Sequence, residues 1–312
     1  MTDNVNSWSV PSDTARVRLD QYLLRLMPDH SRSKIQALIR AGRVRVNDSE
    51  VKTGYQLKAN DMITVQVPQP LPDRPHPEDI ALNILYEDSD LAVIEKPAGM
   101  VCHLGAGVRS GTLVNALLYR IGPLDTGDPT RPGIVHRLDK VTSGVMVVAK
   151  NAWAHRALAQ QFKRREVGKE YLALVHGRPV PAVGTIDLAL GRDPLNRKKI
   201  SIRARKKRTA VTHYRTLKEY GSLSLLSVRI ETGRTHQIRV HLAHKGNPIL
   251  GDRVYGGRRK GQLPIPLQAA AEQLDRVFLH AHRIEFRHPR TGAVLSFTSP
   301  LTPELQHFLA LL

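Results

Sequence analysis

The sequence contains very little cysteine: Cys102 is the single cysteine among 312 residues. One thiol cannot form an intramolecular disulfide or a zinc site built from several cysteines. We therefore expect no disulfide partner and no zinc-dependent deaminase chemistry. Because reduced thiols are typical of the cytoplasm, this composition favours a cytoplasmic protein.

Long hydrophobic runs are also missing. No stretch of about 18 apolar residues occurs, so no transmembrane helix is expected. The amino terminus, MTDNVNSWSVPSDT, has neither the basic segment nor the apolar segment of a secretory signal. The sequence therefore predicts no membrane contact, and residues 1–15 are expected to form a flexible polar tail.

Acidic residues are scarce beside basic ones. Lys and Arg number 47 against 28 for Asp and Glu, which gives a formal net charge of +19 and a pI of 10.4. Such an excess repels itself, and a polyanion such as nucleic acid would offset that repulsion. The alternative is a basic protein without such a partner. A hydrophobic content of 41% is sufficient for a globular core.

Residues 16–67 have the pattern of a small helix-helix-strand domain. Apolar residues recur at helical spacing from Leu19 to Leu26, and Pro28 should end this helix. A second short helix should end at Gly42, which can adopt the left-handed conformation of a helix C-cap. The runs VRVNDSEV and DMITVQV predict strands.

Basic residues are concentrated in this domain. Eight Lys or Arg lie between residues 16 and 45 against two Asp, and a solvated helix face would explain an isolated run of this kind. However, RLDQYLLRLMPDHSRSKIQALIRAGRVRVN resembles the alpha-L RNA-binding module of a small-subunit ribosomal protein, tyrosyl-tRNA synthetases and several RNA-modifying enzymes. The resemblance implies that the second helix and the next loop hold the RNA backbone. The expected contacts are Arg16, Arg18, Arg32, Lys34, Arg40, Arg43 and Arg45.

A proline-rich segment follows the module. Residues 68–77, PQPLPDRPHP, contain five prolines, so we expect a stiff extended linker. Residues 78–312 contain many strand-like runs and a few helical ones. This pattern predicts an α+β domain built on a large mixed or antiparallel sheet.

The densest polar cluster of this second domain is PGIVHRLDKVTSG. Three potential cations surround Asp139, so its carboxylate should stay ionised and could act as a nucleophile or base. An Asp held by a salt bridge in a turn is the structural alternative. The segment resembles the central motif of the RluA/RluC/RluD-type pseudouridine synthases, which reads HRLD, a basic residue and then T-S-G. The resemblance implies that Asp139 is catalytic and that Arg137 occupies the space left by a flipped base. Val141 departs from the pattern, because an acidic residue is common there.

Three further blocks resemble the same family in the same order. EKPAGMVCH precedes the motif, KEYLALVHG follows it, and TGRTHQIRVHLAHKGNPILGD comes later. The resemblance implies that Tyr171 packs against the target base and that Arg239 pairs with the catalytic carboxylate. Tyr171 could instead be an ordinary strand tyrosine, and Arg239 a surface phosphate contact. Other expected RNA contacts near these motifs are His136, Arg137, Lys140, Thr142, Arg234, His236 and Gln237.

Two other groups of residues need an interpretation. His236, His241 and His244 lack the HExxH spacing and an accompanying carboxylate, so we expect no metal and no other cofactor. Nine Lys or Arg lie between residues 192 and 208, which could be a solvated loop. In an RNA-binding domain we expect phosphate contacts there, with Lys206, Lys207 and Arg208 as candidates.

The resemblance implies an isomerase that converts uridine to pseudouridine in large-subunit ribosomal RNA. The overall arrangement is most similar to the RluD type, which modifies the loop of helix 69; the RluC type, with other large-subunit sites, is the alternative. A non-catalytic RNA-binding or ribosome-assembly protein would use the same charge. A base-cleaving glycosylase would need a second acid or base to activate water, and the motifs offer none.

Overall fold

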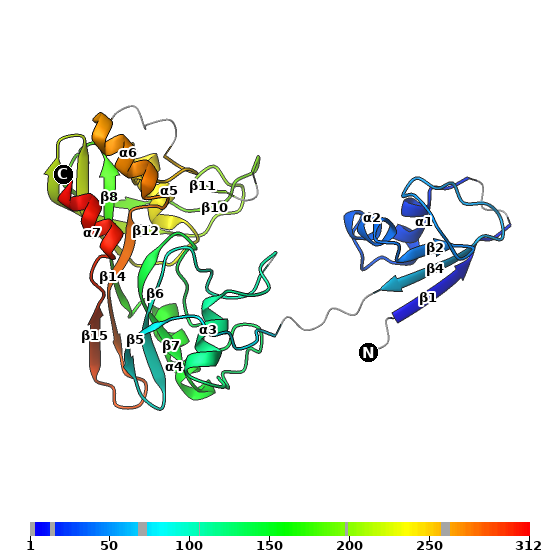
Figure 1. The fold of residues 1–312 in the computed structure, drawn as a ribbon, viewed down its shortest axis with the longest axis horizontal. Coiled ribbons are helices and arrows are strands. Elements are labelled where there is room, and N and C mark those ends of the chain that lie inside the picture. The colour runs from blue at the N-terminus through cyan, green and yellow to red at the C-terminus, as the bar shows by residue number, and fades with distance from the viewer. Residues whose placement is uncertain (1–3, 13–15, 68–73, 106, 197–198, 257–262) are drawn as a thin grey trace. The chain divides into compact units, whose positions relative to one another are not determined.

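The computed structural model describes residues 4–12, 16–67, 74–105, 107–196, 199–256 and 263–312. The chain divides into two compact units, Met1–Pro72 and Asp73–Leu312 (Figure 1). The predicted linker at residues 68–77 contains this division, but its first six residues lie outside the described ranges. Within these ranges, no helix combines the length and apolar composition that crossing a bilayer requires.

The first unit contains the two expected helices and a four-stranded sheet. Its elements are β1 (Asn4–Ser9), α1 (Leu19–Leu26), α2 (Arg32–Arg40), β2 (Val44–Val46), β3 (Ser49–Glu50) and β4 (Met62–Val67). The described strands form a sheet in the order β1-β4-β2-β3. The Ser31 hydroxyl caps α2 by accepting from the backbone N–H of Lys34, and Gly42 follows α2 with φ +67°.

The prediction of a flexible tail at residues 1–15 is wrong for residues 4–9. These residues form β1, an antiparallel edge strand that pairs with β4 from Asn4↔Val67 to Ser9↔Met62. A strand pairs through its backbone N–H and C=O groups, so a mostly polar segment can form one. The sequence of residues 4–9 therefore gave no apolar pattern from which the strand could be predicted. Trp8 packs against the core of this unit, and the fully buried Val10 belongs to that core.

The buried Asp20 connects the two helices of the first unit. Its carboxylate accepts hydrogen bonds from Arg18, from Arg32 at 3.0 and 3.2 Å, and from Gln36 at 2.8 Å. Burial alone would raise the pKa of Asp20, but these donors hold it well below its usual range. Arg18 and Arg32, which the sequence predicts as RNA contacts, therefore stabilise the domain through Asp20.

The second unit is an α+β domain built on a large mixed sheet, as the sequence predicts. In the described ranges this sheet has nine strands, in the order β5-β6-β7-β14-β8-β13-β12-β9, with β15 paired to β14. The strands are β5 (Asn83–Glu87), β6 (Leu91–Lys96), β7 (Ser143–Ala149), β8 (Gly168–His176), β9 (Val183–Asp187), β12 (Val211–Tyr220), β13 (Leu223–Ile230), β14 (Leu279–Arg287) and β15 (Val294–Thr298), with a separate hairpin of β10 (Gly191–Arg192) and β11 (Ile200–Ser201).

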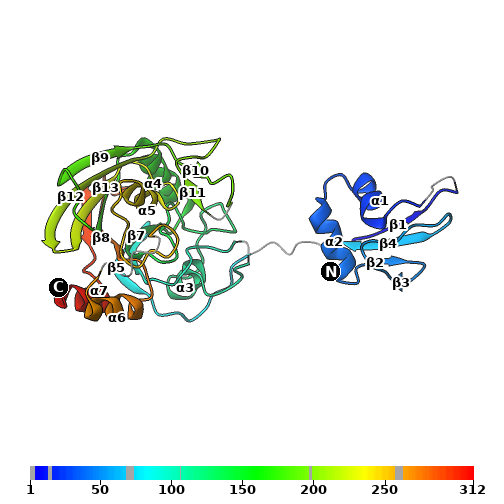
Figure 2. The ribbon, with the colours of Figure 1, turned by 90° about the horizontal axis from the view of Figure 1, so that it is seen from above.

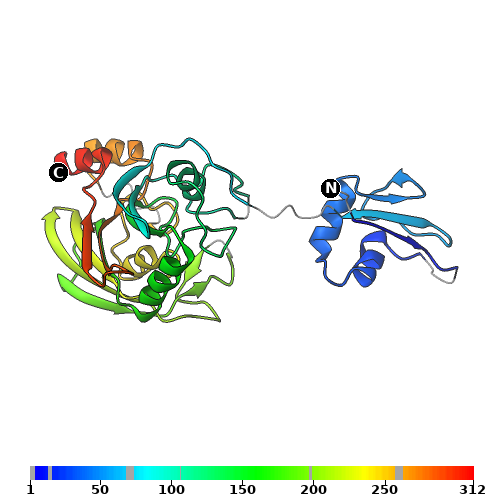
Figure 3. The ribbon, with the colours of Figure 1, turned by 90° about the horizontal axis from the view of Figure 1, so that it is seen from below.

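Helices cover both faces of this sheet. The helices are α3 (Leu113–Arg120), α4 (Ala152–Arg164), α5 (Gln237–His244), α6 (Ile265–Gln273) and α7 (Pro303–Ala310). The core on one face includes Leu305 and Phe308 of α7, whereas the core on the other includes Ala154 and Leu158 of α4. Figure 2 shows α6 and α7 side by side, and Figure 3 shows α4 (green) on the opposite side from them.

The order of the central strands determines where the segments that contain Asp139, Tyr171 and Arg239 meet. β14 comes late in the chain but lies between β7 and β8, parallel to β7 and antiparallel to β8. Gly144 of β7 has φ +118°, and a Cβ there would collide with the backbone of Ala281 on β14. Glycine at the end of the TSG motif thus allows this close parallel pairing.

Candidate active site

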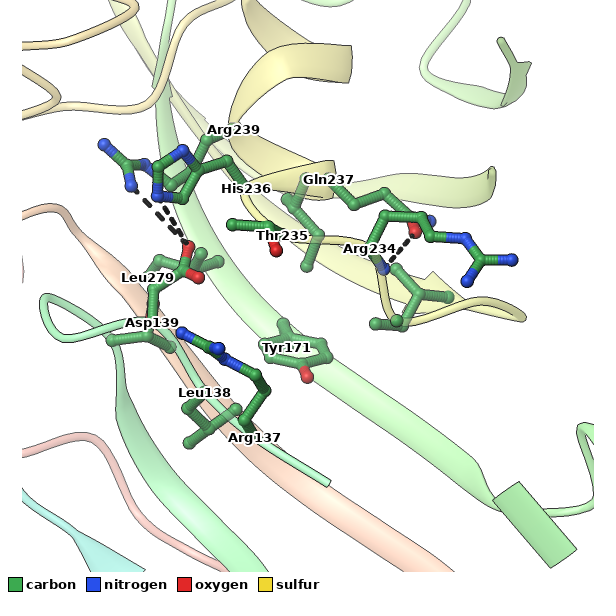
Figure 4. A pocket seen from close by; sticks show the side chains of 14 residues that line it. Arg137, Leu138, Asp139, Tyr171, Arg234, Thr235, His236, Gln237, Arg239 and Leu279 are labelled. Atoms are coloured by element: carbon green, nitrogen blue, oxygen red, sulfur yellow. Dashed lines mark hydrogen bonds and ion pairs between the residues drawn. The ribbon is translucent and has the colours of Figure 1, made fainter. Parts of the chain in front are cut away.

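The loop before β7 carries Asp139 at the edge of a pocket. The Thr142 backbone N–H donates to the Asp139 carbonyl oxygen at 3.1 Å, which closes a tight turn directly before β7. Figure 4 shows Asp139, Arg137 and Tyr171 around this pocket, with Arg239 and His236 on the other side of the carboxylate. Segments about 30 and 100 residues beyond Asp139 in the sequence thus converge here.

Two basic side chains of the α5 region approach the Asp139 carboxylate. Arg239 Nη1 lies 3.6 Å from Asp139 Oδ2, and His236 Nε2 lies 4.0 Å from the same oxygen. Burial lowers the pKa of His236, so its ring is neutral at pH 7. Arg239 is therefore the positive charge beside Asp139, and the carboxylate side chain is only 16% exposed.

The closest partner of Arg239 is a second carboxylate, Asp252. Arg239 Nε donates to Asp252 Oδ2 at 2.7 Å, and Arg239 Nη2 donates to Oδ1 at 2.9 Å. The expected pairing of Arg239 with Asp139 is present, but it is longer than this bidentate pair. The sequence analysis missed Asp252, although it is the last residue of the block TGRTHQIRVHLAHKGNPILGD. This fully buried carboxylate orients the guanidinium toward Asp139.

Tyr255 is a second residue that the sequence analysis missed. Its backbone N–H donates to Asp252, its hydroxyl is 2.8 Å from His236 Nδ1, and Arg239 lies over its ring at 5.2 Å. The same hydroxyl accepts from the backbone N–H of Ile200 at 2.9 Å. Tyr255 therefore connects the basic segment 192–208 to the residues around Asp139.

Tyr171 of β8 forms a wall of the pocket and is 7% exposed. Burial, together with the nearby Asp139 carboxylate, raises the pKa of Tyr171 well above its ordinary value. The phenol is therefore neutral across the physiological pH range. It can pack against an aromatic ring or donate a hydrogen bond, but it cannot act as a base.

Two predicted RNA contacts have hydrogen-bond partners within the protein. The Gln237 amide accepts from Thr232 and the Arg234 N–H, and donates to Val211 and Thr212, so it is fully used within the protein. His136 Nε2 accepts from the Val147 N–H at 3.1 Å, and burial lowers the pKa of His136 to about 3.

The HRLD and TGRTHQ motifs did not reveal these partners, because the His136 partner Val147 lies on β7 and the Gln237 partners Val211 and Thr212 lie on β12, outside both motifs. His241 forms hydrogen bonds with the backbone oxygen of Leu188 and the Thr212 hydroxyl.

The other predicted contacts are distributed over the surface. Arg137 and Arg234 line the pocket, and Lys140 is exposed beside it. Lys206, Lys207 and Arg208 are exposed in the basic segment, where Arg234 Nε donates to the Thr209 carbonyl oxygen. The predicted contacts Arg16, Lys34, Arg40, Arg43 and Arg45 lie in the first unit, and the side chains of all five are exposed or partly exposed.

One group of side chains elsewhere has the spacing of a metal site. Among the described residues, ligand atoms of Asp88, Asp90 and His288 lie within 4.8 Å of one another. Asp88 already accepts hydrogen bonds from His288 and Tyr86, and Asp90 accepts two from Arg290 at 2.6 Å. These partners give the cluster a structural role.

Comparisons with known proteins agree with this geometry. Residues 90–244 match the family model described as RNA pseudouridylate synthase, and residues 17–63 match the S4 domain. An uncharacterized RNA pseudouridine synthase of Aquifex aeolicus is 46% identical over 90% of this chain and 89% of its own. Ribosomal large subunit pseudouridine synthase D of Xanthomonas campestris is 43% identical over 97% of this chain and 91% of its own.

A solved structure shows the same catalytic fold. Human RNA pseudouridylate synthase domain containing 1 superposes with a TM-score of 0.58 at 26% identity, covering 74% of this chain and 89% of the human one. The matched range includes Asp139, Tyr171 and Arg239, whereas Leu279, which also lines the pocket, lies beyond it.

Proposed function

The chain belongs to the family of RNA pseudouridine synthases, and from this premise we propose that it isomerises specific uridines of large-subunit ribosomal RNA with Asp139 as the catalytic carboxylate. The observation that carries the proposal is the convergence of Asp139, Tyr171 and Arg239 on one pocket. A protein that merely binds RNA needs no buried cation aimed at a carboxylate inside a pocket. The non-catalytic alternative is therefore less well supported.

The reaction requires only the groups in this pocket. The bond between the base nitrogen and the ribose must break, the uracil must turn, and carbon 5 must join the ribose. No net oxidation or added group is involved. Asp139 either attacks the anomeric carbon or removes the neighbouring ribose proton, and Arg239 keeps its carboxylate ionised and oriented for either route.

The target nucleotide must leave the RNA stack to reach Asp139, which costs a few kcal/mol. In our proposal Arg137, which is exposed at the rim, fills the vacated space, and Tyr171 stacks on the uracil. Thr142 offers a polar contact inside the pocket. Its hydroxyl oxygen is buried and has no hydrogen-bond partner in the described part of the chain, so substrate is the partner we propose.

Replacement of the catalytic carboxylate tests the proposal. We expect Asp139→Asn to abolish pseudouridine formation while RNA affinity stays near that of the wild type, because the amide keeps the size but cannot act as nucleophile or base. Single-turnover assays on uridine-labelled ribosomal RNA measure the rate. Asp275→Asn, at a 72% exposed carboxylate, is the matched control and should be fully active. Turnover of Asp139→Asn within about tenfold of the wild type would contradict the assignment.

For the target we propose the loop of helix 69, because the relatives that match nearly the whole chain include one named ribosomal large subunit pseudouridine synthase D. Mapping pseudouridines across ribosomal RNA from a strain that lacks the protein tests this choice. Loss of pseudouridine from helix 69 alone supports it. Loss at other large-subunit positions favours an RluC-type activity, and an unchanged map favours a non-catalytic assembly protein.

A further inference from the structure

A second cavity, of about 410 Å³, lies beside the pocket that contains Asp139. Its walls come from the end of α4, the start of β8, and the loops before β7 and after β13. Arg137, Tyr171 and Arg234 line both hollows. An RNA strand with one nucleotide in the catalytic pocket would therefore have its neighbours close to this second cavity, which we call the flanking cavity.

The flanking cavity is strongly positive. The cations that line it are Arg137, Lys163, Arg165, Lys169 and Arg234. The one carboxylate among its lining residues, Glu231, already has partners: Oε1 lies 2.9 Å from His213 Nε2, and Oε2 lies 3.5 Å from Arg165 Nη1. The charge inside the cavity thus remains largely uncompensated by protein.

Lys169, at the start of β8, is less exposed than Arg137, Lys163 and Arg165, which also line the cavity. Its side chain is half-buried, and the described residues give its ammonium no hydrogen-bond acceptor and no ion pair. The ammonium makes a cation–π contact with Phe162, in which Lys169 Nζ lies 5.7 Å from the centroid of the ring. Burial, with the nearby Arg165, lowers the pKa of Lys169 to about 8. A partly desolvated ammonium in such a position is stabilised by any anion that enters.

The carboxylates behind Lys169 are also engaged. Lys169 borders a smaller hollow lined by Glu170, Arg229, Arg283 and Glu285. Glu170 accepts a hydrogen bond from Ser227 at 2.6 Å, and Glu285 accepts one from Arg283 at 2.6 Å. Because both carboxylates have other partners, the ammonium of Lys169 is available to an anion that enters from outside the protein.

The apolar wall of the flanking cavity is held by the catalytic motif. The Phe162 ring stacks on His136 with centroids 4.6 Å apart, and His136 is fixed by its hydrogen bond from the Val147 N–H. Because His136 is neutral, it adds no charge to the cavity. The same motif thus positions both Asp139 and this wall.

We infer that the flanking cavity binds a backbone phosphate of the RNA strand next to the target uridine, and that Lys169 is the cation that contacts it. The inference rests on the proposed function for the place of the uridine. Lys163 has an adequate structural explanation, because cations near a helix C-terminus interact favourably with the helix dipole. Lys169 lies on a strand, and this explanation does not extend to it.

A double-mutant cycle, in which one change is made in the protein and one in the RNA, tests the contact between Lys169 and the phosphate. The probe is a synthetic helix 69 stem-loop in which single linkages on either side of the target uridine carry a neutral methylphosphonate. Binding is measured with the inactive Asp139→Asn protein, with and without Lys169→Met. We expect Lys169→Met to weaken binding about tenfold and to lower the salt slope by about one. One neutral linkage should weaken binding to the Lys169 protein but have no further effect on Lys169→Met.

Lys218→Met is the matched control, since Lys218 is an exposed cation on β12 that does not line the cavity. The neutral linkage should weaken RNA binding to Lys218→Met as much as it weakens binding to the parent protein. The inference is overturned if Lys169→Met binds with the affinity and salt slope of its parent, or if every neutral linkage weakens its binding as much as before. Conversion of the unmodified stem-loop by wild-type protein is assayed in parallel. Its absence would overturn the helix 69 assignment, and the binding cycle would then use a stem-loop around the pseudouridine that the ribosomal RNA map identifies.

Discussion

At the scale of single residues, the arrangement around Asp139 depends on a second carboxylate. Asp252 binds Arg239 through two hydrogen bonds and also accepts from the backbone N–H groups of Val254 and Tyr255. Its side chain is fully buried, whereas that of Asp139 is partly exposed to the pocket. The more buried carboxylate thus orients the arginine, and the more accessible one is free to react.

If Asp252 orients Arg239 and Asp139 reacts, the effect of Asp252→Asn can be predicted. The amide can still accept from the backbone, but it weakens the bidentate pair, so Arg239 should lose its orientation toward Asp139. We expect the saturated rate to fall by about a hundredfold or more, with RNA affinity nearly unchanged. Breaking a buried ion pair should also lower the free energy of unfolding by a few kcal/mol.

Rate, affinity and urea unfolding should be compared with those of Asp275→Asn, whose carboxylate forms a surface ion pair with Arg253. A saturated rate for Asp252→Asn equal to that of this control would show that Asp252 serves stability alone. Arg239→Met is a less informative variant than Asp252→Asn, because it would leave two carboxylates without their cation.

At the scale of elements, a polar network ties the turn between β5 and β6 to the end of β14. Asp88 accepts from His288 at 2.8 Å and from Tyr86 at 2.7 Å, and its Oδ1 accepts from the backbone N–H groups of Asp90 and Leu91. Arg290 binds Asp90 on the same side. The network joins segments about 200 residues apart at one end of the sheet.

The Asp88 network should make stability depend on pH. Burial alone would raise the pKa of Asp88, but the hydrogen bonds from Tyr86, the backbone and His288 outweigh it and lower the pKa to about 2. A carboxyl whose folded pKa is depressed stabilises the protein above its unfolded pKa, near 4, and this contribution is lost as the pH falls toward 2.

We therefore expect Asp88→Asn to lower the free energy of unfolding by about 2 kcal/mol at pH 7, and by progressively less as the pH falls from about 4 to about 2. Urea unfolding across this range measures the difference. Asp79→Asn, at an exposed carboxylate, should follow the wild type. A difference between Asp88→Asn and wild type that stays constant with pH would contradict the electrostatic explanation.

At the scale of the whole molecule, the two units have separate cores and different expected tasks. The first unit is built around Leu19, Leu23, Ile35 and Ile63, and the described residues that line the pocket of Asp139 belong to the second unit. In the first unit Arg18 and Arg32 bind Asp20, whereas the exposed Lys34 has no such carboxylate partner among the described residues.

We predict that the first unit contributes affinity and no chemistry. Deletion of residues 1–72 should raise the RNA concentration needed for half-saturation and flatten the salt dependence of binding, because fewer counterions are released. The rate at saturating RNA should remain close to that of the full chain. In the full chain, Lys34→Gln and Arg40→Gln should each lower the salt slope by about one. If the truncated and full-length proteins bind equally well at 50 and at 200 mM salt, the unit has another role.

The sequence by itself determined those features that depend on neighbours along the chain. The helices α1 and α2, with Gly42 beyond α2, follow from apolar spacing and local backbone preferences. The HRLD and TSG residues likewise mark the loop of Asp139, because a charged run directly before a Ser-Gly turn is a local pattern. The large mixed sheet also followed from the succession of strand-like runs.

The tertiary structure alone decided which partners each polar side chain has. Nothing in the sequence places β14 between β7 and β8, orients Arg239 through Asp252, or shows that Gln237 uses its whole amide within the protein. Likewise, the polar residues of β1 acquired their structure from the exposed edge of β4. The physical reason is that hydrogen bonds and desolvation depend on distances in space, and distant segments acquire those distances only when the strands pair and the core closes.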